Sequence, residues 1–184
     1  LHTEVHSFPT RRSSDLSRSL DEVIARRVAF LTEYQNAKYA RRYSDFVAKV
    51  RAVEAAKAPG STDLSEAVAR YFFKLMAYKD EYEVARLYTS GDFKRRLAQQ
   101  FEGDYKLHFH LAPPLLAKKN AQGQLVKQEY GSWVFTAFKL MAKLRGLRGT
   151  PLDVFGYTAE RRGERTLIGE YEKTVSGLFD KLDA

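Results

Sequence analysis

Cysteine is absent from this chain of 184 residues. The chain can therefore form no disulfide, and it offers no thiolate to a zinc ion or an iron–sulfur cluster. It also lacks an apolar run long enough to cross a bilayer, a glycine-rich phosphate-binding loop, a Gly-x-Ser-x-Gly nucleophile motif and a metal-spaced His/Glu pattern on a helix. Judged by the motifs that carry chemistry, the sequence indicates no active site.

The residues that are present are apolar and basic. A hydrophobic content of 44% with 13% aromatic residues predicts a folded domain rather than a disordered chain. The formal net charge of +8 suits nucleic acid, an anionic cofactor or an acidic protein partner. Lys and Arg are nevertheless interleaved with Asp and Glu along most of the chain, which favours the plainer interpretation of a solvated helical surface.

The first 16 residues differ in kind from the rest. The segment from His6 to Leu16 resembles the translation of a common short-read sequencing adapter. The alternative, a targeting arm, requires an amphipathic pattern that this stretch lacks. We interpret residues 1–16 as an artefactual, non-native segment and residues 17–184 as one domain, a fragment of a larger protein.

Helical spacing of apolar residues begins after Ser19. Ser19 and Glu22 have the capping-box spacing, and the pattern that follows predicts a single long helix, or two with a bend, over residues 20–57. Pro59 and Gly60 end it. A second helix is expected to start at Thr62 or Asp63, with an apolar stripe formed by Leu64, Val68, Tyr71, Leu75, Tyr78 and Tyr82. A short third helix is expected to be lined by Phe93, Leu97 and Phe101.

The period then changes from helix to strand. Apolar and polar residues alternate over residues 105–111, as in a half-buried strand, and Pro113-Pro114 closes it. Residues 115–119 and 124–130, joined by a short turn-rich segment, predict a hairpin. Helical spacing resumes with Trp133, Ala137, Leu140 and Leu144. A last helix is capped by Thr158, and its face is expected to comprise Leu167 or Ile168, Tyr171, Val175, Leu178 and Leu182.

These patterns predict a mainly α fold: a helical domain with a small antiparallel β-hairpin insert. Tyr71, Leu75 and Trp133 are expected in the core, since the first two share the stripe of the second helix and the third opens the helix after the hairpin.

Charged residues are dense between Lys79 and Arg86. On a helix, Lys79 and Glu83 stand four residues apart, a spacing that allows an ion pair. One interpretation is a solvated face, where such pairs contribute only about 0.3–0.5 kcal/mol each. The other is an ordered network at a domain junction, with Lys79, Asp80, Glu83 and Arg86 as its candidates.

Two further groups are candidate contact residues. Arg145 and Arg148 lie between glycines after a helix, where they can grip an anion or a docking partner, or simply complement a helix C-terminus. His108 and His110 lie on one face of the expected strand. Two imidazoles there could bind a metal, but a third ligand is not evident, so surface or interface histidines are the favoured interpretation.

Several blocks of sequence carry a family resemblance. Residues 69–88, 101–105, 109–117, 144–150 and 156–162 resemble, in the right order, the C-terminal region of bacterial indolepyruvate ferredoxin oxidoreductases of the long single-chain type. The resemblance implies that this segment is part of an enzyme that oxidatively decarboxylates aryl-pyruvates to acyl-coenzyme A. Such an enzyme uses thiamine diphosphate and 4Fe–4S clusters as cofactors and ferredoxin as electron acceptor. It also implies a cytoplasmic location and disfavours nucleic acid as a partner; no membrane contact is expected, because no apolar run is long enough to cross a bilayer.

The resemblance assigns no catalytic, cofactor-binding or metal-binding residue within residues 17–184. This segment is therefore expected to be an accessory or structural domain that is inactive by itself, with the remaining domains of the parent enzyme as its partners. The alternative is a stand-alone basic helical module that binds nucleic acid or an anionic partner. A reading frame that continues upstream into cysteine-rich and thiamine-binding motifs favours the first, and a nearby start codon favours the second.

Deleting residues 1–16 tests the interpretation of the amino-terminal arm. We expect the same thermal unfolding midpoint for residues 1–184 and 17–184, because periodic helical sequence begins only after Ser19. A midpoint several degrees lower after deletion would mean that the arm packs against the domain.

Overall fold

The computed structural model describes residues 19–103, 106–111, 126 and 128–182. The predicted arm over residues 1–16, the proline pair at 113–114 and the expected strand over 115–119 lie outside the described residues. No helix in the described ranges is long and apolar enough to span a membrane.

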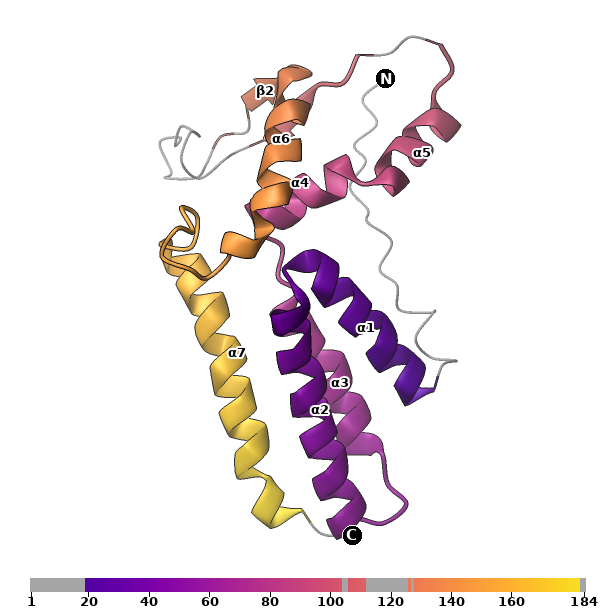
Figure 1. Ribbon diagram of the computed structural model, residues 1–184, viewed down its shortest axis with the longest axis vertical. Helices are drawn as coiled ribbons and strands as arrows, with labels where there is room; N and C mark the ends of the chain where they lie inside the picture. The colour runs from indigo at the N-terminus through magenta and orange to yellow at the C-terminus, as the bar shows by residue number, and fades with distance from the viewer. Residues whose placement is uncertain (1–18, 104–105, 112–125, 127, 183–184) are drawn as a thin grey trace.

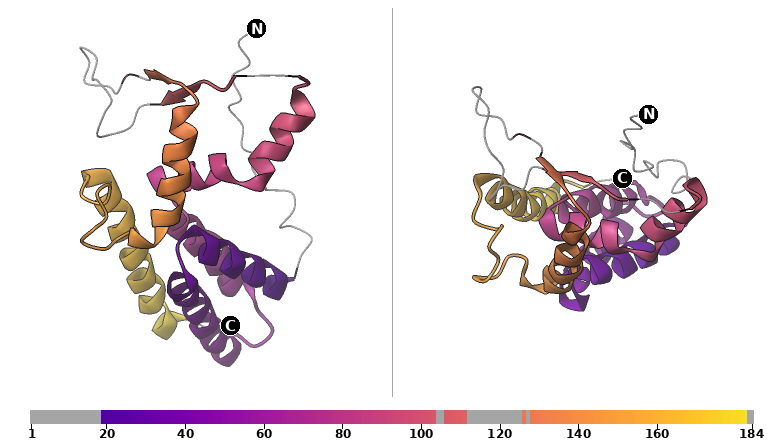
Figure 2. Two further views of the ribbon diagram at one scale, coloured as in Figure 1. Left: turned by 45° about the horizontal axis from the view of Figure 1, so that its top comes forward. Right: turned by 90° about the horizontal axis from the view of Figure 1, so that it is seen from above.

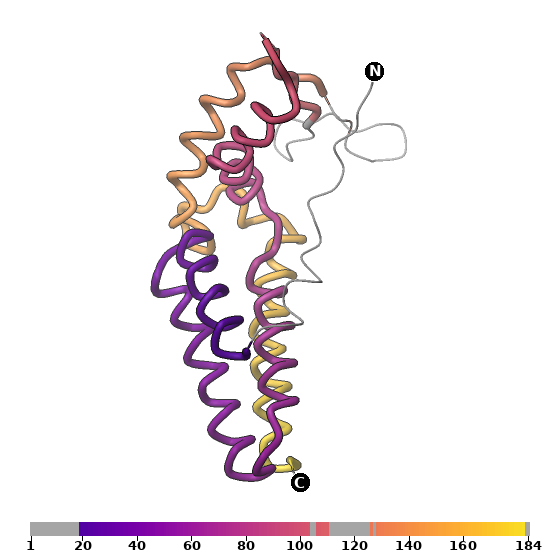
Figure 3. The backbone as a smooth tube through the Cα atoms, turned by 90° about the vertical axis from the view of Figure 1, so that its right-hand side faces the viewer, coloured from indigo at the N-terminus to yellow at the C-terminus, as the bar shows by residue number. Residues whose placement is uncertain are grey.

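Four helices form an elongated bundle at one end of the molecule. They are α1 (Leu20–Tyr34), α2 (Ala37–Lys57), α3 (Asp63–Met76) and α7 (Ala159–Gly177), the last followed by the short 3-10 helix η2 (Phe179–Lys181). Figure 1 shows α2 and α7 running along the length of the bundle, and Figure 3 shows α3 beside α7 in a side view. The predicted mainly α fold is confirmed.

Polar caps set the boundaries of the bundle helices. The Ser19 hydroxyl accepts from the Glu22 amide while the Glu22 carboxylate accepts from the Ser19 amide, which is the predicted capping box. The Asn36 side chain caps α2 by accepting from the Tyr39 amide. Because of that cap, the region predicted as one helix, or two with a bend, is two helices, and the chain turns back between them (Figure 1).

A smaller lobe is inserted between α3 and α7. It contains α4 (Glu81–Thr89), α5 (Gly91–Gln100), strands β1 (Phe109–Leu111) and β2 (Gln128–Tyr130), α6 (Trp133–Lys143) and the 3-10 helix η1 (Leu144–Leu147). Figure 2 shows α6 crossing α4, with the strands at one end of α6 and α5 to the side. The chain thus leaves the bundle after α3 and returns to complete it with α7.

The two strands form an antiparallel pair, as the predicted insert requires, but the pairing differs in detail. Phe109 lies opposite Tyr130, and Leu111 lies opposite Gln128. The sequence pattern paired 124–130 with 115–119 instead. In the structure β2 pairs with the earlier alternating segment, whose Phe109 ring is 5% exposed and packs on α6. Burial of that ring specifies the register.

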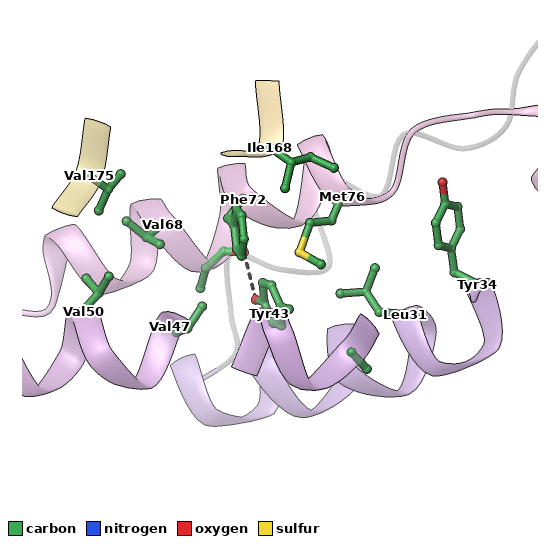
Figure 4. Close-up of a cluster of buried hydrophobic side chains, with 12 residues drawn as sticks. Leu31, Tyr34, Tyr43, Val47, Val50, Val68, Phe72, Met76, Ile168 and Val175 are labelled. Carbon is green, nitrogen blue, oxygen red and sulfur yellow. Dashed lines mark hydrogen bonds between the residues drawn. The ribbon is translucent and has the colours of Figure 1, made fainter. Parts of the chain in front are cut away.

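The core of the bundle is rich in aromatic rings. Phe72 of α3 stacks on Tyr43 of α2 and on Tyr171 of α7, and it contacts Phe46 at 4.9 Å between ring centroids. The Tyr43 hydroxyl donates to the Ala69 carbonyl at 2.9 Å, so its polar atom is satisfied inside the core (Figure 4). Ile168 and Val175 of α7 close this core; of the two alternatives predicted for this face, Leu167 or Ile168, the structure buries Ile168 and leaves Leu167 half exposed.

The stripe predicted for the second helix is wrong in two respects. The helix ends at Met76, and Ala77–Asp80 separate it from α4, so the pattern to Tyr82 spans two helices. Tyr71 is half exposed, with the Lys74 ammonium over its ring, whereas neighbouring Phe72 is fully buried. Three consecutive aromatic residues left the rotation of the helix ambiguous. In the structure the Phe72 ring, which carries no hydroxyl, faces the core, and the Tyr71 ring faces outward. Leu75 is partly buried against the core, in line with its predicted place.

Trp133 was also expected in the core, and that prediction is wrong. Its side chain is 62% exposed, whereas Val134 and Phe138 of the same helix are buried against α4 and β1. The two alternatives differ by a rotation of one residue, about 100° around the helix axis. The structure selects the face on which the Phe138 ring stacks on Tyr88 and meets Phe109 edge to face.

A pair of neighbouring substitutions checks the rotation of α3. Phe72→Ala is expected to lower the free energy of unfolding by about 3–5 kcal/mol, because it removes a fully buried ring. Tyr71→Ala is the matched control and is expected to cost less than about 1 kcal/mol. Urea unfolding curves of both variants decide. Equal losses, or a larger loss for Tyr71→Ala, would contradict this orientation.

Candidate functional site

Acidic side chains cluster at the start of α4, and each of them forms an ion pair with an arginine. Asp80 pairs with Arg148 from the segment after η1, and Glu81 pairs with Arg161 of α7. Glu83 pairs with Arg86 one turn along α4 itself. We call these six residues the junction network, since α4 lies where the smaller lobe meets the bundle (Figure 1).

Arg148 and Asp80 form the central pair of the network. Both guanidinium donors on one side meet the carboxylate, Nε to Oδ2 and Nη2 to Oδ1, the latter at 2.8 Å. The remaining side of Arg148 donates to the Tyr34 carbonyl at 2.6 Å, at the end of α1. The guanidinium carbon lies 3.7 Å from the centre of the Tyr34 ring. The fork-shaped ion pair joins the two ends of the smaller lobe to each other, and the carbonyl and cation–π contacts of the same arginine tie them to α1.

Burial strengthens the attraction between the two charges, and it also makes either charge costly to leave unpaired. Arg148 is 4% exposed and Asp80 is 3% exposed. Burial alone would lower the pKa of Arg148, but the hydrogen bond to the Asp80 carboxylate and the attraction of its charge raise it above its ordinary value. Desolvation also raises the pKa of the Tyr34 hydroxyl, which donates to the Tyr78 carbonyl at 2.8 Å. Arg148 therefore stays charged and Tyr34 stays neutral.

Asp80 has a second task at the start of α4. Its Oδ1 accepts from the Glu83 amide at 2.8 Å, so it is the N-cap of the helix while it holds Arg148. A negative charge at this end also complements the helix dipole. The same carboxylate therefore begins α4 and anchors it.

The loop before α7 is organised around another buried carboxylate. Asp153, 2% exposed, accepts from the amides of Gly149 and Gly156 and from the Tyr82 hydroxyl. A Cβ atom at Gly156 would lie 2.4 Å from an Asp153 oxygen, so only glycine fits there. Because Gly149 directly follows Arg148, this loop sets the approach of Arg148 to Asp80.

The other two pairs reach further elements. Arg86 grips Glu83 through two bonds of 2.7 and 2.8 Å, and it also lies 3.5 Å from Glu33 of α1. At the start of α7 the Thr158 hydroxyl accepts from the Arg161 amide. The Arg161 side chain lies 3.3 Å from the Glu81 carboxylate and 2.6 Å from the Glu164 carboxylate. The network therefore connects α4 to both α1 and α7.

Sequence reasoning found part of this network and misplaced part of it. Asp80, Glu83 and Arg86 lie in the junction network, which favours the ordered-network interpretation over the solvated face; Lys79 is exposed, and Glu83 pairs with Arg86. Arg148, a candidate to grip an anion or a docking partner or to complement a helix C-terminus, is instead buried in the ion pair with Asp80 and is not accessible to a partner. Its partner lies 68 residues earlier in the chain, a distance that no local pattern reveals. Arg145 is half-buried and donates to the Ala142 carbonyl at 3.4 Å, as a helix-end arginine does.

The two histidines lie away from the junction network. His108 and His110 are both exposed, and the His108 Nδ1 atom meets the Glu129 carboxylate across the strand pair. The described part of the chain contains no group of three residues suited to hold a metal. An open hollow of about 610 Å³ lies beside His108 and is lined by Lys106, Leu107, His108, Phe109, Gly131, Ser132, Phe135 and Thr136.

Sequence reasoning also missed a buried carboxylate inside the bundle. Glu54 of α2, 2% exposed, accepts from the amides of Leu64 and Ser65 at 2.8 and 2.9 Å and so caps α3 from a neighbouring helix. Burial would raise its pKa, but the hydrogen bonds from Ser65, Leu64 and Ser61 lower it below the ordinary value. No local pattern reveals this cap, because Glu54 lies ten residues before Leu64, and Thr62, the residue before α3, looks in the sequence like an ordinary N-cap although it makes no cap bond in the structure.

Comparison with known proteins assigns a family. Residues 20–184 match the family of unknown function DUF6537, and the chain belongs to that family. No curated protein and no solved structure matches the chain.

Breaking the central pair tests the network. Arg148→Met is expected to lower the free energy of unfolding by about 3–5 kcal/mol, because it leaves Asp80 buried and uncompensated. Arg95→Met is the control. It breaks the exposed Arg95–Asp92 pair and should cost less than about 1 kcal/mol. Urea unfolding measures both, and a cost for Arg148→Met as small as that of the control would show that the contacts of Arg148 do not stabilise the junction.

Proposed function

We propose that this chain is a non-catalytic accessory domain of a 2-oxoacid:ferredoxin oxidoreductase of the indolepyruvate type, and that its task is structural. The resemblance of five sequence blocks to the C-terminal region of those enzymes supports the assignment of the parent enzyme. The junction network supports the structural task. Its buried charges are paired with one another and join two lobes, instead of converging on a cavity where a substrate could react.

The chemistry of the parent reaction needs groups that this chain does not supply. The absence of cysteine means that no iron–sulfur cluster can be held here by thiolates. We infer that thiamine diphosphate, the clusters and the sites for coenzyme A and the aryl-pyruvate belong to other domains of the parent. This domain would brace them or cover their cleft.

The whole reading frame that contains residues 17–184 gives the decisive experiment. Expressed intact, it should contain thiamine diphosphate and iron, and it should reduce a viologen dye with an aryl-pyruvate only when coenzyme A is present. A frame without cysteine-rich motifs, or a purified protein without that activity, would overturn the proposal.

The structural task has its own readout in the same enzyme. Arg148→Met should shorten the half-life of activity on warming while the Michaelis constant for the aryl-pyruvate stays unchanged, because the network lies outside the reacting centre. Arg95→Met is again the matched control. A raised Michaelis constant with unchanged thermal inactivation would assign Arg148 to substrate binding and contradict the bracing role.

The isolated chain tests the alternative of a basic binding module. After incubation with iron and sulfide it should show no cluster absorbance, and a labelled DNA oligonucleotide should not bind at physiological salt. The charge of +8 is spread among acidic side chains, so the phosphate contacts that dominate such affinity are few. Saturable, salt-dependent DNA binding would favour the nucleic-acid module instead.

A further inference from the structure

The outer face of α6 carries an apolar stripe that no described element covers. Trp133, Leu140 and Leu144 are 62%, 61% and 41% exposed, and Ala137 lies between them. We call these four residues the α6 seam. They recur at intervals of four, three and four residues, which places the first three in one line along α6 and Leu144, the first residue of η1, at the end of that line. The helix buries its other side, Val134 and Phe138, against α4 and β1.

The spacing of the seam is the one that binds another helix. Alternating intervals of three and four residues are the a and d positions of a two-helix interface. A small Ala137 between larger neighbours leaves room for a side chain of the facing helix. An exposed tryptophan at one end and leucines beyond it have the composition of an interface centre rather than of ordinary protein surface.

Charge beside the seam specifies the partner. Lys139 and Lys143 are exposed on the same helix, and no Asp or Glu occurs between Glu129 and Asp153. The interleaving of acidic and basic residues that holds along most of the chain therefore fails here. A second copy of this chain would bring lysine against lysine, whereas a helix with carboxylates beside its apolar stripe would be attracted.

We propose that the α6 seam binds an acidic amphipathic helix of a partner protein, with Trp133 and Leu140 as apolar anchors and Lys139 and Lys143 as charged contacts. The inference concerns this chain alone and does not depend on the proposed parent enzyme.

Trp133 is the only tryptophan of the protein, so its fluorescence reports this face directly. The probe is a synthetic amphipathic helical peptide with Leu at the a and d positions and Glu elsewhere. Two matched peptides carry Gln or Lys in place of Glu. The Glu peptide should shift the Trp133 emission saturably to shorter wavelength, and added salt should weaken its binding. The Gln peptide should bind roughly tenfold more weakly, and the Lys peptide should not bind.

Variants separate charge and apolar contacts. Lys139→Glu with Lys143→Glu should exchange the preference, so that the Lys peptide binds and the Glu peptide does not. Arg41→Glu with Lys173→Glu makes the same change in net charge on exposed positions of the bundle and should leave binding unchanged. Leu140→Ser should weaken binding of the Glu peptide on the order of tenfold. Its circular dichroism should stay that of the unsubstituted protein, since the side chain is exposed.

Several results would overturn the proposal. One is a lack of any response to the peptides, and another is equal binding of the Glu and Gln peptides. A blue shift with vesicles of phosphatidylglycerol and phosphatidylcholine, without a response to the Glu peptide, would assign the seam to a membrane surface. Protection of Trp133 from acrylamide quenching in the free protein would mean that the seam is already covered. Dependence of that protection on protein concentration would identify a second copy as the cover.

Discussion

The Arg148 guanidinium, paired with Asp80 and packed on Tyr34 of α1, is the group on which the arrangement of the two lobes depends. A pair this buried contributes little net stability by itself, because the attraction between the charges is offset by the cost of taking both from water. Its importance lies in geometry. The planar guanidinium must meet the carboxylate, the Tyr34 carbonyl and the Tyr34 ring at once, and few orientations of the lobes satisfy all three. The pair therefore favours one arrangement over the alternatives more than it favours folding itself.

Much of the fold follows from local sequence rules. The caps at Ser19 and Thr158, the helical class and the presence of an antiparallel strand pair depend on residues close together in the chain, and periodicity and capping chemistry predict them. Asn36 shows how a local signal is lost. A single N-cap residue inside a continuous apolar pattern separates two helices, and the pattern alone does not distinguish it from a polar surface position.

What could not be predicted depends on long-range packing. The rotation of α3 and α6 differs from the prediction by one residue, because both sequences contain adjacent large apolar side chains that form two plausible faces. The neighbours, Tyr43 and Tyr171 in one case and Tyr88 and Phe109 in the other, decide between them. The burial of Arg148 could not be predicted for a related reason. An arginine between glycines has the same sequence context whether its partner is solvent or a carboxylate far along the chain.

The insertion of the smaller lobe between α3 and α7 has a consequence for synthesis. As the chain leaves the ribosome, α1, α2 and α3 emerge first, and the Phe72 ring that Tyr171 will cover lacks this neighbour until the final helix is made. The native bundle joins the two ends of the domain, a topology of high sequence separation that slows folding. A ribosome that pauses within the inserted lobe would hold an apolar three-helix intermediate, the kind of species that chaperones bind. The domain is then most prone to aggregate during its synthesis, because of the order of its elements along the chain and not because the finished domain is unstable.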